Sequence, residues 1–285
     1  MSRRALAGRI LPPAALALTA GLLLSRLIVV AMTDRSGFPL GMDVQLYLDA
    51  THRWLGGGPF YPDYQVSGPY AIRHGAILYP PPILLLLLPF TVLPLALWWL
   101  VPLGIIGWVV WRLRPSVLGW AGILGALAAP ATIGTLVNGN PVIWATAALA
   151  LGTLYAWPAA FAALKVSIAP FALFGCWQRS WWLAAGTGLL VSLAFLPMWP
   201  DYVRVLLNSS HPRGPLYSIA EVPLLMLPLI AWLARTRHPS ASWSAQGRGT
   251  AGGTGRSWGI VAPSPRRRQR TREVLPIDGT FGGSA

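Results

Sequence analysis

Long apolar segments follow one another along most of this chain, and they restrict its fold more than any other feature. Most are near the roughly 20 residues that a helix needs to cross a ~30 Å hydrocarbon core. Because lipid offers backbone groups no hydrogen-bond partners, such segments are expected to be helical. The sequence therefore predicts an all-α, polytopic transmembrane bundle of seven or eight spans, at about Ile10–Met32, Tyr79–Trp111 (one or two crossings), Val117–Leu136, Pro141–Tyr155, Pro158–Trp177, Trp181–Trp199 and Tyr217–Ala234.

The composition excludes several classes of protein. Charged residues make up 11 % of the chain and hydrophobic residues 54 %, whereas a soluble domain carries roughly 25 % charged residues. This composition excludes a cytosolic enzyme, a nucleic-acid-binding module and a secreted domain. The protein is expected to lie in the lipid bilayer. The lone Cys176 excludes an internal disulfide and a thiolate metal site. With no His/Cys cluster and no Gly-rich phosphate motif, no metal and no cofactor are predicted.

The distribution of charge predicts two domains and a topology. Arg3, Arg4 and Arg9 precede the first apolar segment, which places the N-terminus in the cytoplasm. Residues 33–78 hold half of the acidic residues and form the predicted extracytoplasmic loop of a transmembrane domain over 1–237. Residues 238–285 are rich in Gly, Ser, Pro and Arg and are predicted to be disordered. Either this tail is a basic segment that touches anionic lipid, or it is the product of a frameshift.

A short helix in the first loop carries the main candidate for chemistry. Asp43, Tyr47, Ala50 and Trp54 recur at spacings of four, three and four residues, so they share one face. Asp49 has His52 and Arg53 within one turn, but Asp43 has no cation at these spacings. Asp43 is therefore either a helix cap or a carboxylate available for reaction.

Three further motifs have both a structural and a functional interpretation. Tyr79-Pro80-Pro81-Pro82 is suited to a rigid helix start, and Asn138-Gly139-Asn140-Pro141 is typical of a turn. Lys165 is the sole lysine and lies in an apolar segment. A cation there is a candidate for a functional site, unless it lies at a helix end and extends to the membrane interface.

The ordered set of these motifs resembles glycosyltransferase family 87, which includes polyprenyl-phosphate-mannose-dependent α-1,2-mannosyltransferases. The resemblance spans about Ile10 to Tyr202. It is carried by Asp43, Tyr47, Ala50, Trp54-Leu55, Gly57, Pro59-Phe60-Tyr61, Tyr79-Pro80-Pro81, Pro89, Pro94, Asn138-Gly139-Asn140, Lys165, Pro170 and Trp199-Pro200-Asp201-Tyr202.

The resemblance implies a GT-C-like fold with an extracytoplasmic active site in the cell membrane. It implies transfer of a hexose, mannose in the family, from a polyprenyl-phosphate donor to a glycolipid or glycan acceptor. Asp43 matches the family's catalytic base and Lys165 its lysine before a proline, while Asn140 keeps part of a Gly-Gln-x-Asn pattern. Members usually carry further spans where this chain has its Arg-rich tail.

The residue types are compatible with that chemistry independently of the resemblance. One carboxylate suffices as general base for a single displacement. Fixed cations stabilise the phosphate that leaves, and the candidates are Arg53, Arg73, His74 and Lys165, with Tyr47 and Asn140 as further substrate-binding residues. Two alternatives remain, which are an inactive or truncated homologue and a polytopic transporter or flippase.

Overall fold

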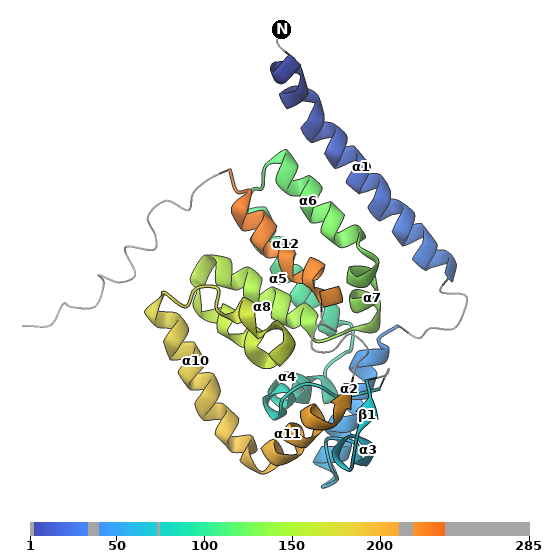
Figure 1. Ribbon diagram of the computed structural model, residues 1–285, viewed down its shortest axis with the longest axis vertical. Coiled ribbons are helices and arrows are strands. Elements are labelled where there is room, and N and C mark those ends of the chain that lie inside the picture. The colour runs from blue at the N-terminus through green and yellow to red at the C-terminus, as the bar shows by residue number, and fades with distance from the viewer. Residues whose placement is uncertain (1–2, 34–39, 73–74, 211–218, 237–285) are drawn as a thin grey trace, which may run out of the picture. The chain divides into compact units, whose positions relative to one another are not determined.

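The computed structural model describes residues 3–33, 40–72, 75–210 and 219–236, and these residues are mostly helical (Figure 1). The all-α class is confirmed. The elements are α1 (Arg3–Thr33), α2 (Met42–Leu55), α3 (Asp63–Val66), β1 (Tyr70–Ala71), the 3₁₀ helix η2 (Pro81–Ile83), α4 (Leu84–Leu87), η3 (Leu88–Thr91), α5 (Leu97–Leu113), α6 (Val117–Ala128), α7 (Pro130–Asn138), α8 (Val142–Tyr155), η4 (Trp157–Leu164), η5 (Val166–Ile168), α9 (Ala169–Ala172), α10 (Arg179–Ser192), η6 (Leu193–Met198), α11 (Trp199–Asn208), β2 (Ser209–Ser210) and α12 (Val222–Leu233).

Some of these helices are long and apolar enough to cross a membrane. Within the described residues they are Leu11–Val29 and the continuous stretch Arg179–Asn208, and a third span results if α6 and α7, bent by 63°, are taken together. Further apolar helices, α5 and α8 among them, are shorter. The predicted number of seven or eight spans therefore stays a prediction.

The predicted segment Pro158–Trp177 differs most from the structure. Instead of one helix it forms η4, η5 and α9, and the backbone is extended at Lys165 (φ −130°, ψ 116°). Pro158 and Pro170 have no N–H group to donate within a helix. Segment Tyr79–Trp111 is also divided, because the chain leaves the helical path between Thr91 and Leu97.

The long apolar helices pack against one another and enclose an aliphatic core. α12 packs against α5, α6 and α8, and α1 lies along α6 (Figure 1). The buried side chains between α5, α6, α8 and α12 are nearly all Ala, Val, Leu and Ile. None of the residues in the span Leu11–Val29 of α1 is buried, and so large an exposed apolar surface is suited to contact with lipid.

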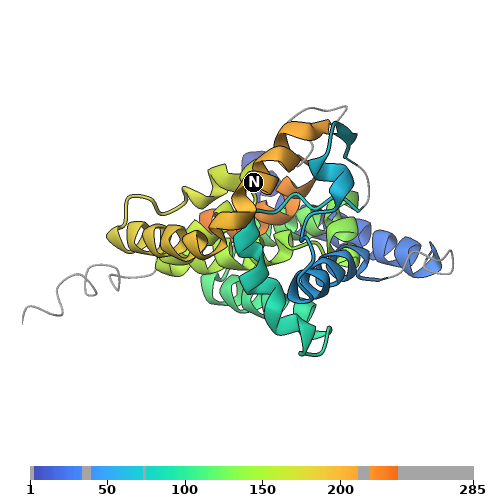
Figure 2. The same ribbon diagram turned by 90° about the horizontal axis from the view of Figure 1, so that it is seen from below.

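The described part of the predicted first loop, residues 40–72 and 75–78, folds into a unit with a largely aromatic core. β1 pairs in parallel with β2, and Figure 2 shows α11 beside α3 and β1. The fully buried side chain of Gln65 hydrogen-bonds to the Tyr70 hydroxyl and to both backbone polar groups of Ile77. Asn208 of α11 donates to the carbonyl groups of Gln65 and Val66. These bonds fasten α11 to the segment that precedes the second apolar region.

Candidate functional site

Asp43 lies in the first turn of α2 and is half-buried. The N-cap residue of the helix is Gly41, which has a left-handed φ of 83°. Asp43 is therefore not the N-cap residue that the sequence suggested, but an acidic residue within the first turn. The predicted shared face of the helix is confirmed in part, because Tyr47 and Ala50 are buried and Trp54 is half-buried.

Two glycines bring the start of α2 against the turn between α7 and α8. The Gly41 N–H donates to the Val137 carbonyl over 2.8 Å. Gly139 has a φ of 68°, and a Cβ atom there would lie 2.9 Å from both Trp99 and Val44. Glycine is thus needed at residue 139 for its backbone conformation and for the close approach. The expected turn at Asn138–Pro141 is confirmed, and it lies beside Asp43.

Asn140 connects Asp43 to Tyr79. Its Nδ2 donates to Asp43 Oδ2 over 2.8 Å, while its Oδ1 accepts from the Tyr79 hydroxyl at 2.8 Å and from the Val142 N–H at 3.1 Å. A backbone N–H can only donate, so the bond from Val142 fixes which side of the amide faces α8. The NH₂ group must then face the Asp43 carboxylate.

Tyr79 lies where the folded loop meets the apolar helices. It is followed by Pro80, whose extended backbone precedes η2, so the predicted rigid helix start is confirmed. The Tyr79 carbonyl accepts from the buried Tyr61 hydroxyl at 2.8 Å, and its ring meets Tyr47 edge to face. The Lys165 ammonium lies 5.4 Å from the centroid of the same ring, within the range of a cation–π contact.

Lys165 forms an ion pair inside the protein. Its partner is Glu221, the residue just before α12, and the side chains are 5 % and 13 % exposed. The alternative in which Lys165 extends to the membrane interface is therefore wrong. The second Glu221 oxygen, Oε2, is buried, and the described residues offer it no hydrogen bond. Within the described residues, the Glu221 carboxylate is thus hydrogen-bonded through only one of its two oxygens.

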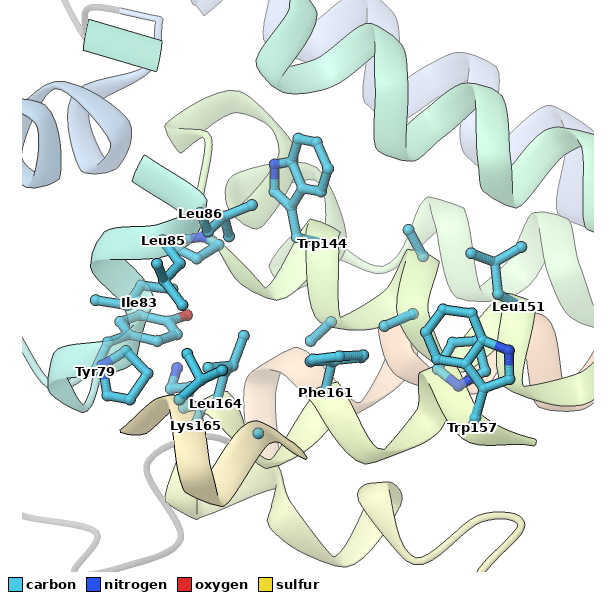
Figure 3. Close-up of a pocket in the computed structure, with 18 of the residues that line it drawn as sticks. Tyr79, Ile83, Leu85, Leu86, Trp144, Leu151, Trp157, Phe161, Leu164 and Lys165 are labelled. Atoms are coloured by element: carbon cyan, nitrogen blue, oxygen red, sulfur yellow. The ribbon is translucent and has the colours of Figure 1, made fainter. Parts of the chain in front are cut away.

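An elongated cavity of about 530 Å³ opens beside this pair (Figure 3). Tyr79 and Lys165 lie at one end of it, and Leu151 and Trp157 lie at the other. The rest of the lining is almost wholly apolar, from η2, α4, α5, α8, η4 and α10. Thr187 of α10 lines the cavity and is exposed, so the cavity reaches the surface beside that helix.

Of the predicted residues that the structure describes, Tyr79 and Lys165 line this cavity, whereas Asp43, Tyr47, Arg53 and Asn140 do not. Arg53 donates to the carbonyl groups of Pro59 and Phe60, so it closes the turn after α2. It lies ten residues from Asp43 along α2, roughly 15 Å at 1.5 Å per residue. Tyr47 is close through its contact with Tyr79. Arg73 and His74 lie outside the described residues, as does the predicted tail.

The structure also adds functional candidates that the sequence did not single out. Glu221 is the partner of Lys165, and Trp144 lines the cavity with a buried indole Nε1 to which the described residues offer no hydrogen bond. A signal for Glu221 was available, because it is the one acidic residue between Asp201 and Glu273 and Lys165 is the one lysine. No such signal marks Trp144 among 15 tryptophans.

Within the part of the chain that the structure describes, no group of three His, Cys, Asp or Glu side chains is arranged to hold a metal ion. A comparison of the chain with protein-family models, with curated proteins and with solved structures finds no match.

Proposed function

We propose that the protein is a membrane glycosyltransferase that moves a hexose, in the first instance mannose, from a polyprenyl-phosphate donor to a glycolipid or glycan acceptor. The observation that carries the proposal is the connection from Asp43 through Asn140 and Tyr79 to a cavity with Lys165 at its end. A half-buried carboxylate, an apolar cavity and a buried cation are the three parts that this reaction needs.

Asp43 acts as the general base in a single displacement. The acceptor hydroxyl oxygen forms a bond to C1 of the sugar while the bond from C1 to the phosphate oxygen breaks. The acceptor proton passes to the Asp43 carboxylate, and polyprenyl phosphate leaves with the electron pair. The bond from Asn140 Nδ2 restricts rotation of the carboxylate and so favours one approach of the acceptor.

The donor occupies the cavity and its apolar end. Part of the prenyl chain lies among the apolar side chains, and the phosphate lies near Lys165 and the Tyr79 hydroxyl. A cation in a site from which water is excluded stabilises the negative charge that develops on the leaving phosphate. A lipid-linked donor also needs no nucleotide-binding domain, which suits a chain of this composition.

The charge distribution supports an extracytoplasmic site. Backbone hydrogen bonds from Ser116 to Ala234 and from Thr236 to Arg114 join the end of α12 to the turn between α5 and α6. Arg112, Arg114 and Arg235 thereby gather at one end, which the positive-inside rule assigns to the cytoplasm. The acidic residues Asp43, Asp49, Asp63 and Asp201 belong to the structured first loop and to α11.

The test is sugar transfer by the purified full-length chain with polyprenyl-phosphate-mannose and candidate glycolipid acceptors. We expect Asp43→Asn to abolish transfer, because an amide cannot take the acceptor proton. Asp49→Asn is the matched control, since this carboxylate is on the same helix and exposed. Transfer that survives in the Asp43 variant would refute its role, and a wild-type chain without transfer would favour an inactive homologue.

Lipid translocation is the second candidate, and the buried Lys165–Glu221 pair beside an apolar cavity is the observation that favours it. Buried ionisable residues commonly mark the pathways of transporters. Reconstitution in proteoliposomes separates the two functions, because a translocase moves a labelled prenyl phosphate between leaflets with no acceptor present.

A further inference from the structure

An anionic ligand in the cavity would have to share Lys165 with Glu221, which does not itself line the cavity. Lys165 lines the end of the cavity, and its ammonium is paired with the Glu221 carboxylate on the side of α12. A phosphate that enters from the cavity therefore approaches a cation that already has a partner. Because two anions close together repel each other, the carboxylate and the phosphate compete for the same charge.

The pair has the properties of a contact that can be exchanged. A buried cation without a partner is strongly unfavourable, so the ligand-free protein needs a carboxylate beside Lys165. Yet this carboxylate is imperfectly bound, because its Oε2 is buried and finds no hydrogen bond within the described part of the chain. A phosphate has more acceptor oxygens than a carboxylate, so it can accept the hydrogen bonds of the Lys165 ammonium in place of Glu221.

The start of α12 offers the Glu221 carboxylate an alternative position when a ligand displaces it from Lys165. Glu221 is the N-cap residue of α12, and its side chain currently makes no capping bond. Residues 219–221 form a helical turn that continues into α12, and the N-terminal end of a helix favours a negative charge nearby. With 13 % exposure against 5 % for Lys165, Glu221 is the more accessible partner.

We infer that Glu221 is a placeholder carboxylate, which neutralises Lys165 in the ligand-free protein and is displaced by the phosphate of a prenyl phosphate lipid. This inference rests on the proposed donor site at Lys165. It makes donor binding an exchange of one anion for another, so that Lys165 is never left as a lone buried charge. It also predicts that removal of the Glu221 charge strengthens phosphate binding, which a purely structural ion pair does not predict.

The experiment measures binding of farnesyl phosphate to the full-length chain in detergent, with farnesol as the uncharged probe of the same chain. Trp144 and Trp157 line the cavity, so tryptophan fluorescence reports on occupancy. We expect Glu221→Gln to bind farnesyl phosphate at least about tenfold more tightly than wild type, since one hydrogen bond to a charged group is worth about that factor. Farnesol binding should not change.

Each comparison separates one claim from another. Equal binding of farnesyl phosphate by wild type and by Lys165→Gln would overturn the donor site itself, and with it this inference. If Lys165 matters but Glu221→Gln binds like wild type or more weakly, the placeholder role alone fails. Inorganic phosphate should not compete at the same concentrations, and equal competition would overturn the assignment of a lipid ligand.

A second variant covers the case in which Glu221→Gln does not fold. Glu221→Asp keeps the charge at the start of α12 but shortens the side chain by one methylene, so it weakens the contact with Lys165. Its affinity for farnesyl phosphate should lie between those of wild type and Glu221→Gln. An Asp variant that is folded and binds as wild type does would contradict the exchange.

Discussion

The side-chain amide of Asn140 donates to the carboxylate of Asp43 over 2.8 Å, across 97 positions of sequence. The bond joins the first folded segment after α1 to the start of α8. It therefore has two consequences that can be measured apart, one for the stability of the fold and one for the orientation of the proposed base.

The first prediction concerns Asn140→Ala. The change leaves the Val142 N–H and the Tyr79 hydroxyl without the acceptor they now share, so we expect a loss of about 1–3 kcal/mol in the free energy of unfolding. Sugar transfer should fall further than stability explains, when measured at a temperature where both proteins are folded. Asn138→Ala is the control, because the described residues give this neighbouring side chain no hydrogen bond. Equal effects of both variants would contradict a positioning role.

The second prediction concerns the close approach at Gly139. An alanine there adopts a left-handed φ and brings its Cβ to 2.9 Å from Trp99 and Val44. Backbone strain of this kind costs about 1–3 kcal/mol, to which the overlap adds. The control is Gly134→Ala in α7, where a Cβ meets nothing within 4 Å and helix propensity favours alanine. Thermal unfolding in detergent should show a lower midpoint for Gly139→Ala alone.

Local patterns along the chain predicted several of these elements correctly. The helix that carries Asp43 follows from a 3.6-residue period, the turn at Asn138–Pro141 from its residue types, and the start of η2 from three prolines. All of these depend on neighbours within a few positions. The all-α class follows in the same way from the length of the apolar segments.

The relations between distant segments could not be predicted in this way. Local charge spacing left Asp43 without a partner, because Asn140 is far away in sequence. The burial of Lys165 depends on an irregular segment around Pro158 and Pro170 and on Glu221, 56 positions away. Apolarity alone indicated a continuous helix there, although the backbone is extended at Lys165, the residue that forms the ion pair.

The third prediction concerns alkaline pH. Burial raises the pKa of Tyr61 well above its ordinary value of 10.0, and the neighbouring Tyr202 and Asp201 raise it further. The folded state thus prefers the neutral phenol, so this contribution to stability is complete below about pH 10 and is lost as the pH rises above that value. The unfolding midpoint of wild type should fall more steeply above pH 10 than that of Tyr61→Phe.

At neutral pH the Tyr61→Phe variant should be less stable by about 1 kcal/mol, because the Tyr79 carbonyl loses its donor. The difference between the two proteins should shrink as the pH rises. Tyr155→Phe serves as control, since Tyr155 is exposed. Parallel pH profiles for wild type and Tyr61→Phe would show that the phenol makes no such contribution.

The last prediction fills the cavity from α10. Gly188 lines it, and a Cβ there meets nothing within 4 Å, so we expect the side chain of Gly188→Leu to extend into the cavity. Because the new side chain occupies room for a prenyl chain rather than for a phosphate, farnesyl phosphate and farnesol should lose affinity by the same factor. Transfer from a polyprenyl-phosphate donor should fall with them.

Gly186→Leu is the matched control, since Gly186 is on the same helix with equal room for a Cβ but outside the lining. If only farnesyl phosphate lost affinity, the leucine at residue 188 would have acted on the contact between the phosphate and Lys165. The prenyl chain would then not lie beside residue 188.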